Sequence, residues 1–426
     1  MLCLAFKRHH LWRDFGALVF GASVLLPCAA VADTLTLREA QALALQQNPS
    51  LGALNQKIIT LQHQSVAVAQ LPDPHLSFGA VNLPTNNFSM NTMQMSMLSI
   101  GLSQTFPPFG QLTRKRRQLH LEVQASKDTL AGRSAALILL LERSWLQTVA
   151  IKREIAVLHT QQSLAKRTIQ TALAAYRAGR GTEASVIEAQ LALEKLQNDE
   201  TQLFAEYQED RARLAETLAL PSPPHISSSW PQLPSPPSLA QLITQIAAQP
   251  LLRAAAEQSA AAQEAVRVAR TAYLPEITLS TAYGQDFAPG SPNWLSVGVN
   301  LSLPIFPADR QDQTVAAAQA QSIAAQDQYD EERLSLERQV RGVFAAYISY
   351  QNQYHRTRRK LVPEAQLAYQ ATLADFTSSH TSFRAVLQAQ DRVLATQTEA
   401  IELRQNAYAS QAELNFLATH VQGGSE

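Results

Sequence analysis

The sequence contains the alternating segment Leu98-Ser99-Ile100-Gly101-Leu102, and it returns almost 200 residues later as Leu295-Ser296-Val297-Gly298-Val299. Apolar residues occupy every second position in both copies, and small or polar residues fill the positions between them. A period of two is typical of a β-strand with one apolar and one polar face. Each copy continues to a proline and an aromatic residue. Working outward from this pair, we expect a duplicated chain with strands in each half.

Other segments repeat in the same order and at a similar offset. Two capping boxes, Thr36–Glu39 and Ser238–Gln241, each open an Ala-rich helix. Further matched segments are Pro49-Ser50-Leu51 with Pro250-Leu251-Leu252, 74–78 with 275–279, and 186–190 with 386–390. Several ordered matches are unlikely by chance, so the halves are two copies of one unit rather than unrelated domains.

A proline-rich segment lies between the two units. Residues 221–237 hold a run of prolines that fits neither a helix nor a central strand, so we expect a semi-rigid extended linker. The first repeat then covers residues 33–220 and the second covers 238–420. Each repeat is predicted to contain a helix, a β-hairpin and a long helical hairpin. The hairpins are predicted at 75–106 and 110–218 in the first repeat, and at 276–304 and 308–418 in the second.

The N-terminus predicts export. Residues 1–32 combine a basic start, an apolar core over 15–26 and the small-residue site Ala30-Val31-Ala32, as in a cleaved signal peptide. Two alternatives stay open: an uncleaved anchor, and lipidation at Cys28. Both cysteines, Cys3 and Cys28, lie in this segment. The mature chain is therefore expected to have no thiols and no disulfides.

The predicted strands favour a membrane barrel. After Ala32 we find no apolar run of about 18 residues, so we expect no spanning helix and assign membrane crossing to strands. A half-buried sheet in a soluble protein alternates in the same way. Four strands, however, leave two open edges, and about eight are the fewest that close a barrel. The chain must then oligomerise, and three copies would supply twelve strands in contact with outer-membrane lipid.

Two segments predict unusually long helices. Residues 110–178 contain no proline and one internal glycine, Gly132, so a helix on the order of 100 Å is expected. Its counterpart over 308–377 is interrupted by Pro363, where we expect a kink. Coiled-coil spacing of apolar residues supports lateral packing. The spaced residues are Val186, Leu193, Leu196, Leu203, Tyr207, Leu214 and Leu218, and then Val340, Phe344, Tyr347, Tyr354 and Leu361.

Charge and motifs argue against other classes of function. Lys and Arg balance Asp and Glu at 35 each, so no overall field points to nucleic acid as a partner. The sequence has no nucleophile elbow, phosphate-binding loop or metal-ligand spacing, and its histidines are scattered. We therefore expect no enzyme activity and no cofactor.

These features together resemble the TolC outer-membrane efflux family. The resemblance rests on Thr34–Ala40 with Asn48-Pro49, on Leu71–Pro74 before the first strand, and on the duplicated segments 186–190 and 386–390. It implies a mainly helical homotrimer with a twelve-stranded outer-membrane barrel, continued in the periplasm by an α-helical coiled-coil barrel. It also implies two partners, a periplasmic adaptor protein and an inner-membrane pump of the RND type.

The resemblance further implies roles for the turns between the long helices. Adaptor docking is implied for Ala178, Gly179 and Arg180 in the first turn, and for Ser378, Ser379 and His380 in the second. Ser379 stands where the family often has Gly. Gating in the family involves side chains just past these turns, which here include Glu183, Ser185 and Arg384.

The region around Met95–Gln104 is similar to the heavy-metal branch of the family, the CusC and CzcC channels. By strand parity Met93, Met95 and Met97 would face the lumen, where thioethers suit Cu(I) or Ag(I). The alternative is that these methionines fill a flexible strand end. We expect a passive conduit for copper and silver, or cobalt, zinc and cadmium. Drug export, type I protein secretion and a non-conducting periplasmic scaffold remain alternatives.

Overall fold

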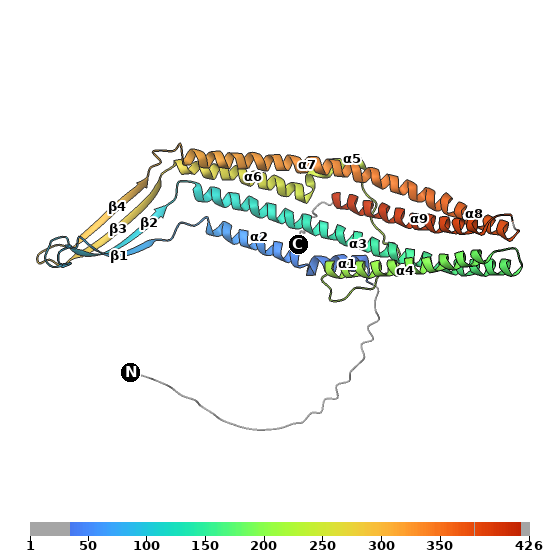
Figure 1. Cartoon of the computed structure of the whole chain (residues 1–426). Coiled ribbons are helices and arrows are strands. Elements are labelled where there is room, and N and C mark those ends of the chain that lie inside the picture. The colour runs from blue at the N-terminus through green and yellow to red at the C-terminus, as the bar shows by residue number, and fades with distance from the viewer. Residues whose placement is uncertain (1–34, 379, 419–426) are drawn as a thin grey trace, which may run out of the picture.

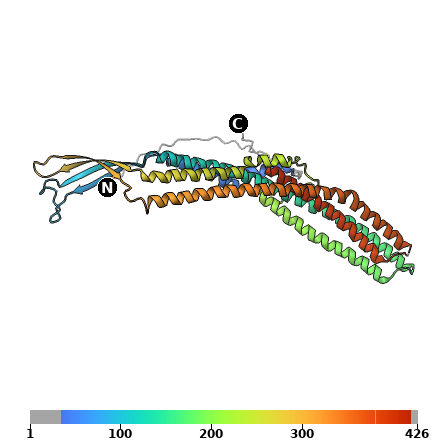
Figure 2. The ribbon, with the colours of Figure 1, turned by 90° about the horizontal axis from the view of Figure 1, so that it is seen from above.

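A computed structural model describes residues 35–378 and 380–418. The molecule is elongated, with four strands at one end, the turns of two helical hairpins at the other, and helices running between them (Figure 1). Seen from above, the helical body bends between the strands and these turns (Figure 2). The predicted combination of long helices with four strands is confirmed. The predicted signal peptide, with Cys3 and Cys28, lies outside the described residues.

The two repeats place equivalent elements in the same order. The first contains α1 (Leu37–Gln47), α2 (Pro49–Ala67), β1 (His75–Val81), β2 (Met97–Phe106), α3 (Gln111–Arg177) and α4 (Glu183–Thr217). The second contains α5 (Leu239–Gln245), α6 (Pro250–Arg270), β3 (Glu276–Asp286), β4 (Trp294–Ser302), α7 (Gln311–Arg356), α8 (Val362–Thr377) and α9 (Phe383–Leu417). Short 3₁₀ turns, Ile246–Ala248 and Thr271–Tyr273, flank α6, and a π-helical turn, η3 (Thr357–Leu361), joins α7 to α8.

Each repeat begins with two helices where the sequence predicted one. Thr36 and Glu39 form the predicted capping box at α1. The chain then breaks at Asn48, whose side chain accepts a hydrogen bond from the Ser50 amide at 3.0 Å and so caps α2. Pro49 occupies the first turn of α2, where its missing N–H costs no helical hydrogen bond. Pro250 starts α6 in the same way.

The four strands form one antiparallel sheet in the order β1-β2-β3-β4. The central pair joins the repeats, since β2 runs against β3 from Met97 opposite Asp286 to Phe106 opposite Ile277. Within the part of the chain that the structure describes, β1 and β4 each pair along one edge. The hairpins of the two repeats therefore make a single curved sheet with two open edges.

The faces of this sheet differ as the alternation predicted. On one face lie exposed apolar side chains from all four strands: Leu76, Phe78, Leu98, Ile100, Leu102, Ile277, Leu279, Tyr283, Leu295, Val297, Val299 and Leu301. The other face carries small and polar residues that pack closely. A Cβ added at Gly101 would lie 2.6 Å from Ser77 Oγ, and one at Gly298 would lie 2.8 Å from Ser280 Oγ. Each hairpin thus carries one Gly–Ser pair on this face.

The loops between paired strands differ in length between the two repeats. The first connection is longer and covers 82–96, whereas the second is shorter and covers 287–293. The reason lies at Asp286, which still pairs with Met97 in the ladder. Its carboxylate accepts the Met95 amide at 2.7 Å and the Ala288 amide at 2.9 Å, which ties the two loops together.

Helix α3 is one uninterrupted helix of 67 residues. Helix α3 does contain a stretch that is long and apolar enough to cross a membrane by length and composition alone, which the search for an apolar run did not find. Its apolar residues have another role. Leu141, Trp145 and Val149 are buried in a cluster with Leu214 of α4 and Ile226 of the linker. This helix therefore supplies the core of the helical body.

The counterpart of α3 is interrupted differently from the prediction. The π turn η3 precedes Pro363, which sits in the first turn of α8. A proline inside a helix removes one backbone hydrogen bond, and a π turn is one way of rearranging the preceding turn. The π turn also shifts the helical positions that face the core, which explains why Leu361 is exposed. This residue continues the predicted heptad series but is exposed, whereas Val340 earlier in that series is buried.

The proline-rich linker is fixed to the helices by side chains. Its carbonyl groups accept hydrogen bonds from Lys152 and Arg153 of α3, Arg211 of α4, and Gln411 and Asn415 of α9. Ile226 is fully buried, and Trp230 stacks on Tyr408 with 5.4 Å between ring centroids. The linker thus closes the core around the middle of the helical body.

Glu142 lies on α3 at the edge of this core. Its environment leads us to expect that the free energy of unfolding depends on pH. Burial raises its pKa to about 7 from an ordinary 4.5, although Gln41 donates a hydrogen bond to it. The folded chain therefore holds this proton more tightly than the unfolded chain. The resulting stability is complete below about pH 4.5, declines as the pH rises to about 7 and is lost above that.

Glu142→Gln keeps the shape of the side chain and removes the ionisable group. At pH 8 we expect the variant to be more stable than the parent by on the order of 2 kcal/mol, with little difference near pH 4.5. Urea unfolding at both pH values measures this. The exposed Glu399→Gln is the matched control. Equal gains for Glu142→Gln at both pH values would contradict the assignment.

Candidate functional site

The candidate site is the end of the molecule remote from the strands, where two helical hairpins turn. In the α3–α4 turn, Ala178, Gly179 and Arg180 are all exposed. Gly179 adopts φ +71, a conformation that suits glycine. The amides of Arg180 and Gly181 donate to Ala175 O at 2.9 and 3.1 Å, which closes the end of α3. The turn is short and internally hydrogen-bonded, and it presents Arg180 to the surroundings.

The α8–α9 turn is built differently. Ser379 lies outside the described residues, and its neighbours Ser378 and His380 are exposed. The His380 amide donates to Asp375 O at 2.8 Å, and the imidazole Nδ1 lies 2.8 Å from Ser378 Oγ. The two turns therefore present different chemistry, an arginine in one and a histidine in the other.

A hydrophobic cluster packs the two turns against each other. Ala172 of α3, Ala189 of α4 and Phe383 of α9 are buried together at this end of the molecule. Phe383 meets Phe376 of α8 edge to face, with 5.3 Å between centroids. Since the members come from four helices, this cluster sets the position of one hairpin relative to the other.

The predicted gate residues have different environments. Arg384 Nη2 lies 3.3 Å from Glu188 Oε1 of the other hairpin, in an ion pair whose arginine side chain is 74% exposed. Ser185 contributes its amide and its hydroxyl to the cap that Thr182 forms on α4. Glu183 is exposed in the first turn of the same helix. Arg384 is thus the predicted gate residue that bridges the two hairpins.

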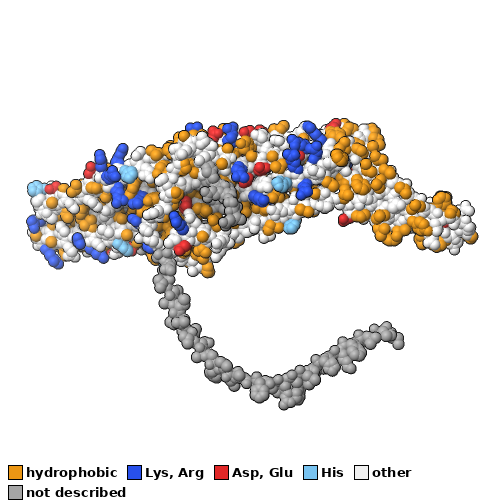
Figure 3. Space-filling view, turned by 180° about the vertical axis from the view of Figure 1, so that it is seen from behind, with side chains coloured by type: hydrophobic (Ala, Val, Ile, Leu, Met, Phe, Trp, Pro, Cys, Tyr) orange, Lys and Arg blue, Asp and Glu red, His pale blue; other side chains and the backbone are white. Residues whose placement is uncertain are grey.

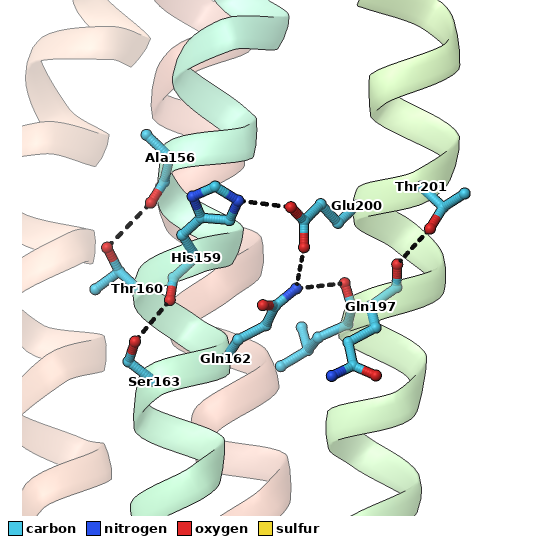
Figure 4. A network of polar contacts seen from close by, with 9 residues as sticks. Ala156, His159, Thr160, Gln162, Ser163, Gln197, Glu200 and Thr201 are labelled. Atoms are coloured by element: carbon cyan, nitrogen blue, oxygen red, sulfur yellow. Dashed lines mark hydrogen bonds and ion pairs between the residues drawn. The ribbon is translucent and has the colours of Figure 1, made fainter.

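A polar network on the α3–α4 hairpin lies further from the turn (Figure 4). The Glu200 carboxylate of α4 lies 2.6 Å from His159 Nε2 and accepts a hydrogen bond from Gln162 Nε2 at 2.6 Å. Hydrogen bonds from Gln162 and then His159 lower the pKa of Glu200. Gln162 also donates to the Leu196 carbonyl. The network holds the two helices in register.

The predicted metal-binding methionines do not share one strand face. Met97 is the first residue of β2, while Met93 and Met95 lie in the loop over 82–96 and are about half exposed. Met95 adopts φ +71, so the alternation of the strand does not extend to it. Met97 lies over Gly284, where an added Cβ would overlap its sulfur. The parity argument for Met93 and Met95 was therefore wrong.

Sequence reasoning did not find the partner of Arg384. Glu188 belongs to the duplicated segment 186–190, but its side chain is one of many exposed acids in the sequence. Its significance comes from the packing of α9 on α3 and α4. Among the described residues, no group of three or more His, Cys, Asp or Glu side chains is placed to bind a metal.

The chain is an elongated helical protein with a small antiparallel sheet at one end and helical turns at the other (Figure 1). Comparisons with known proteins point to a family with this fold. The family model for outer membrane efflux proteins matches residues 244–420, which lie in the second repeat. No curated protein sequence matches the chain significantly.

Solved structures share the fold over almost the whole chain. VceC, an outer membrane protein of Vibrio cholerae, has a TM-score of 0.75 and 18% identity, covering 90% of this chain and 96% of that one. CusC, whose structures were studied for folding and transmembrane channel formation, has a TM-score of 0.74 and 18% identity. The match covers 89% of this chain and 91% of that one. The open-state MtrE outer membrane channel of Neisseria gonorrhoeae has a TM-score of 0.72 and 17% identity, with coverage of 90% and 88%.

The family model and these structures together support the TolC-like outer membrane efflux family predicted from the sequence. Identities below 20% establish the fold and not the cargo. CusC is only one of several channels with nearly equal TM-scores, so the likeness does not single out the heavy-metal branch.

The ion pair between the hairpins generates a prediction. Glu188→Ala and Arg384→Ala should each destabilise the chain slightly, and a double-mutant cycle should give a coupling energy of about 0.2–1 kcal/mol because the pair is exposed. Thermal unfolding at low salt and at about 1 M salt measures it, since screening should reduce the coupling. Arg392→Ala, an exposed change on the same helix, is the control. A coupling that is zero at low salt would contradict the pairing.

Proposed function

We propose that this chain is the outer-membrane channel of a tripartite efflux system and works as a homotrimer. The proposal places the strands in the outer membrane and the helices in the periplasm. It includes the predicted periplasmic adaptor and inner-membrane RND-type pump as partners. The observation that carries it is the four-stranded sheet, which has an exposed apolar face and two open edges.

The apolar face matches a lipid surface. Val297 is 79% exposed, Leu295 and Phe78 are each 72% exposed, and apolar neighbours on adjacent strands continue the surface. Hydrophobic side chains gather over the strand end of the molecule, whereas charged side chains lie over the helices (Figure 3). Exposing so large an apolar surface to water is unfavourable, and lipid removes that cost.

The open edges support oligomerisation. Lipid offers no hydrogen-bonding partners for the free N–H and C=O groups of β1 and β4, so a sheet in a membrane must close on itself. Four strands are too few to close, and three copies supply twelve. β4 of one copy would then pair with β1 of the next, and the small and polar residues of the opposite face would line the lumen.

The remote turns support docking and gating. Ala178, Gly179, Arg180, Ser378 and His380 project at the end that would face the inner membrane, which suits an adaptor surface. The Arg384–Glu188 pair joins hairpins at this end, and it is weak enough to exchange for other contacts. We infer that its loss favours separation of the hairpins, which is the change that an opening gate requires.

The proposal that the apolar face of the sheet contacts lipid can be tested by placing a charge on each face in turn. Val297→Arg places a charge on the face assigned to lipid, at a cost of about 2–4 kcal/mol near the bilayer midplane. Its neighbour Ser296 lies on the opposite face, so Ser296→Arg is the matched control. We expect Val297→Arg to reduce the amount of assembled trimer in outer-membrane fractions, while Ser296→Arg assembles and changes the ion selectivity of the pore in planar bilayers.

Equal assembly of the two variants would contradict the lipid-facing assignment. Failure of the purified parent to form any pore would favour the alternative of a non-conducting periplasmic scaffold.

For the cargo we propose heavy-metal cations, on the likeness of Met95–Gln104 to the heavy-metal branch. A deletion strain should lose tolerance to at least one of copper, silver, zinc, cobalt and cadmium, and the parent gene should restore it. Unchanged tolerance to all five would contradict a metal cargo without affecting the channel assignment. A variant with Leu at Met93, Met95 and Met97 tests direct coordination, which is ruled out if copper tolerance stays intact.

A further inference from the structure

Three arginines converge on one pocket in the middle of the helical body. Arg153 comes from α3, Arg358 from the π turn η3 and Arg404 from α9. The pocket has a volume of about 550 Å³, and its aromatic lining comes from Trp230 of the linker and Tyr354 of α7. Every other residue that lines it is uncharged. The pocket thus draws on both repeats and on the linker, and it presents one sign of charge.

Hydrogen bonds hold these side chains in place. Arg358 and Arg404 both donate to the Tyr354 hydroxyl, at 2.6 and 3.0 Å. Arg153 Nε donates to the Ser228 carbonyl of the linker at 2.8 Å. A guanidinium has five N–H donors, so each arginine keeps donors for a further partner.

Aromatic rings support the same guanidinium groups. Arg404 lies over Trp230, Tyr354 and Tyr408, with 5.4–5.6 Å to each ring centroid. Arg153 lies 5.4 Å from the centroid of the same indole. Stacked guanidiniums lose little conformational freedom on binding a ligand, because the rings have already restricted their rotation.

The positive charges have no acidic partner. Among residues 35–378 and 380–418, no carboxylate makes an ion pair with Arg153, Arg358 or Arg404. Other arginines of the helical body do have such partners, as Arg253 has in Asp128 at 3.0 Å. Like charges brought together repel one another, and burial and the nearby Arg404 lower the pKa of Arg153. An anion in the pocket would remove this repulsion.

The π turn η3, which precedes Pro363, lies beside this pocket. π-Helical turns are rare and frequently occur at functional sites, and this turn carries Arg358 at the pocket. The equivalent position in the first repeat lies in the unbroken helix α3. The interruption and the arginine therefore occur together in only one of the two repeats.

We propose that this pocket binds a small multivalent anion through carboxylate or phosphate oxygens. The planar guanidinium fork matches both groups geometrically, and two or three forks favour a ligand with more than one acidic group. The ligand would connect α3, α9, the π turn and the linker, and so join the two repeats at mid-height. This site is separate from the remote turns and from the strands, and it does not depend on the identity of the exported cargo.

The test uses the purified full-length protein in its assembled form, with citrate and pyrophosphate as the probes. Isothermal titration at constant ionic strength should give saturable binding of at least one probe. Arg153→Gln and Arg358→Gln should each weaken that binding about tenfold, the effect of losing one charge-assisted hydrogen bond. Arg404→Gln is unsuitable, because Arg404 packs among three rings and its loss would disturb the fold.

Arg359→Gln is the matched control, because Arg359 lies on the same π turn but does not line the pocket. Quenching of Trp230 fluorescence reports occupancy directly, and Trp230→Phe should remove that signal. Citrate binding without pyrophosphate binding assigns carboxylate chemistry, and the reverse assigns phosphate. Absence of saturable binding by either probe, or equal affinity in the parent, Arg153→Gln and Arg358→Gln, would overturn the proposal.

Discussion

The backbone of the two outer strands sets the main constraint on this molecule. Among the described residues, β1 and β4 each have a strand partner along one edge, and in hydrocarbon each unpaired N–H or C=O group of the other edge costs several kcal/mol. The apolar face beside them favours lipid. In the proposed membrane channel, both requirements would be met when further copies complete the sheet. Since α3 and α7 begin shortly after β2 and β4, closing the sheet would also arrange the long helices of all copies in a ring.

Duplication gives the two halves equal dimensions, and a few residues then make them different. Helix α3 has 67 residues, and α7, η3 and α8 together also span 67. The second half nevertheless contains Pro363 and a π turn, which change the phase of the helix. Its turn presents His380 where the first presents Arg180. An adaptor that meets both turns would therefore encounter two related but chemically distinct surfaces.

The sequence predicted features that depend on local periodicity and missed those that depend on tertiary contacts. Alternation placed Leu98, Val297 and their neighbours on the correct face, because the two faces of a strand differ at every step. It failed at Met95, whose amide binds a carboxylate 191 residues away and whose backbone has left the strand. The heptad series failed at Leu361, the last residue of the π turn, which is exposed. Glu188 and the arginine pocket required knowledge of how separate helices pack.

The linker shows how an extended segment becomes part of the structure. A proline-rich chain cannot pair its carbonyl groups in a helix or a sheet, and here side chains of α3, α4 and α9 donate to them instead. These bonds hold Trp230 against Arg153 and Arg404. The remote turns are joined by a small hydrophobic cluster and by the exposed Arg384–Glu188 pair. Because the linker is hydrogen-bonded to three helices in the middle of the body, separation of the hairpins would cost least at the turns.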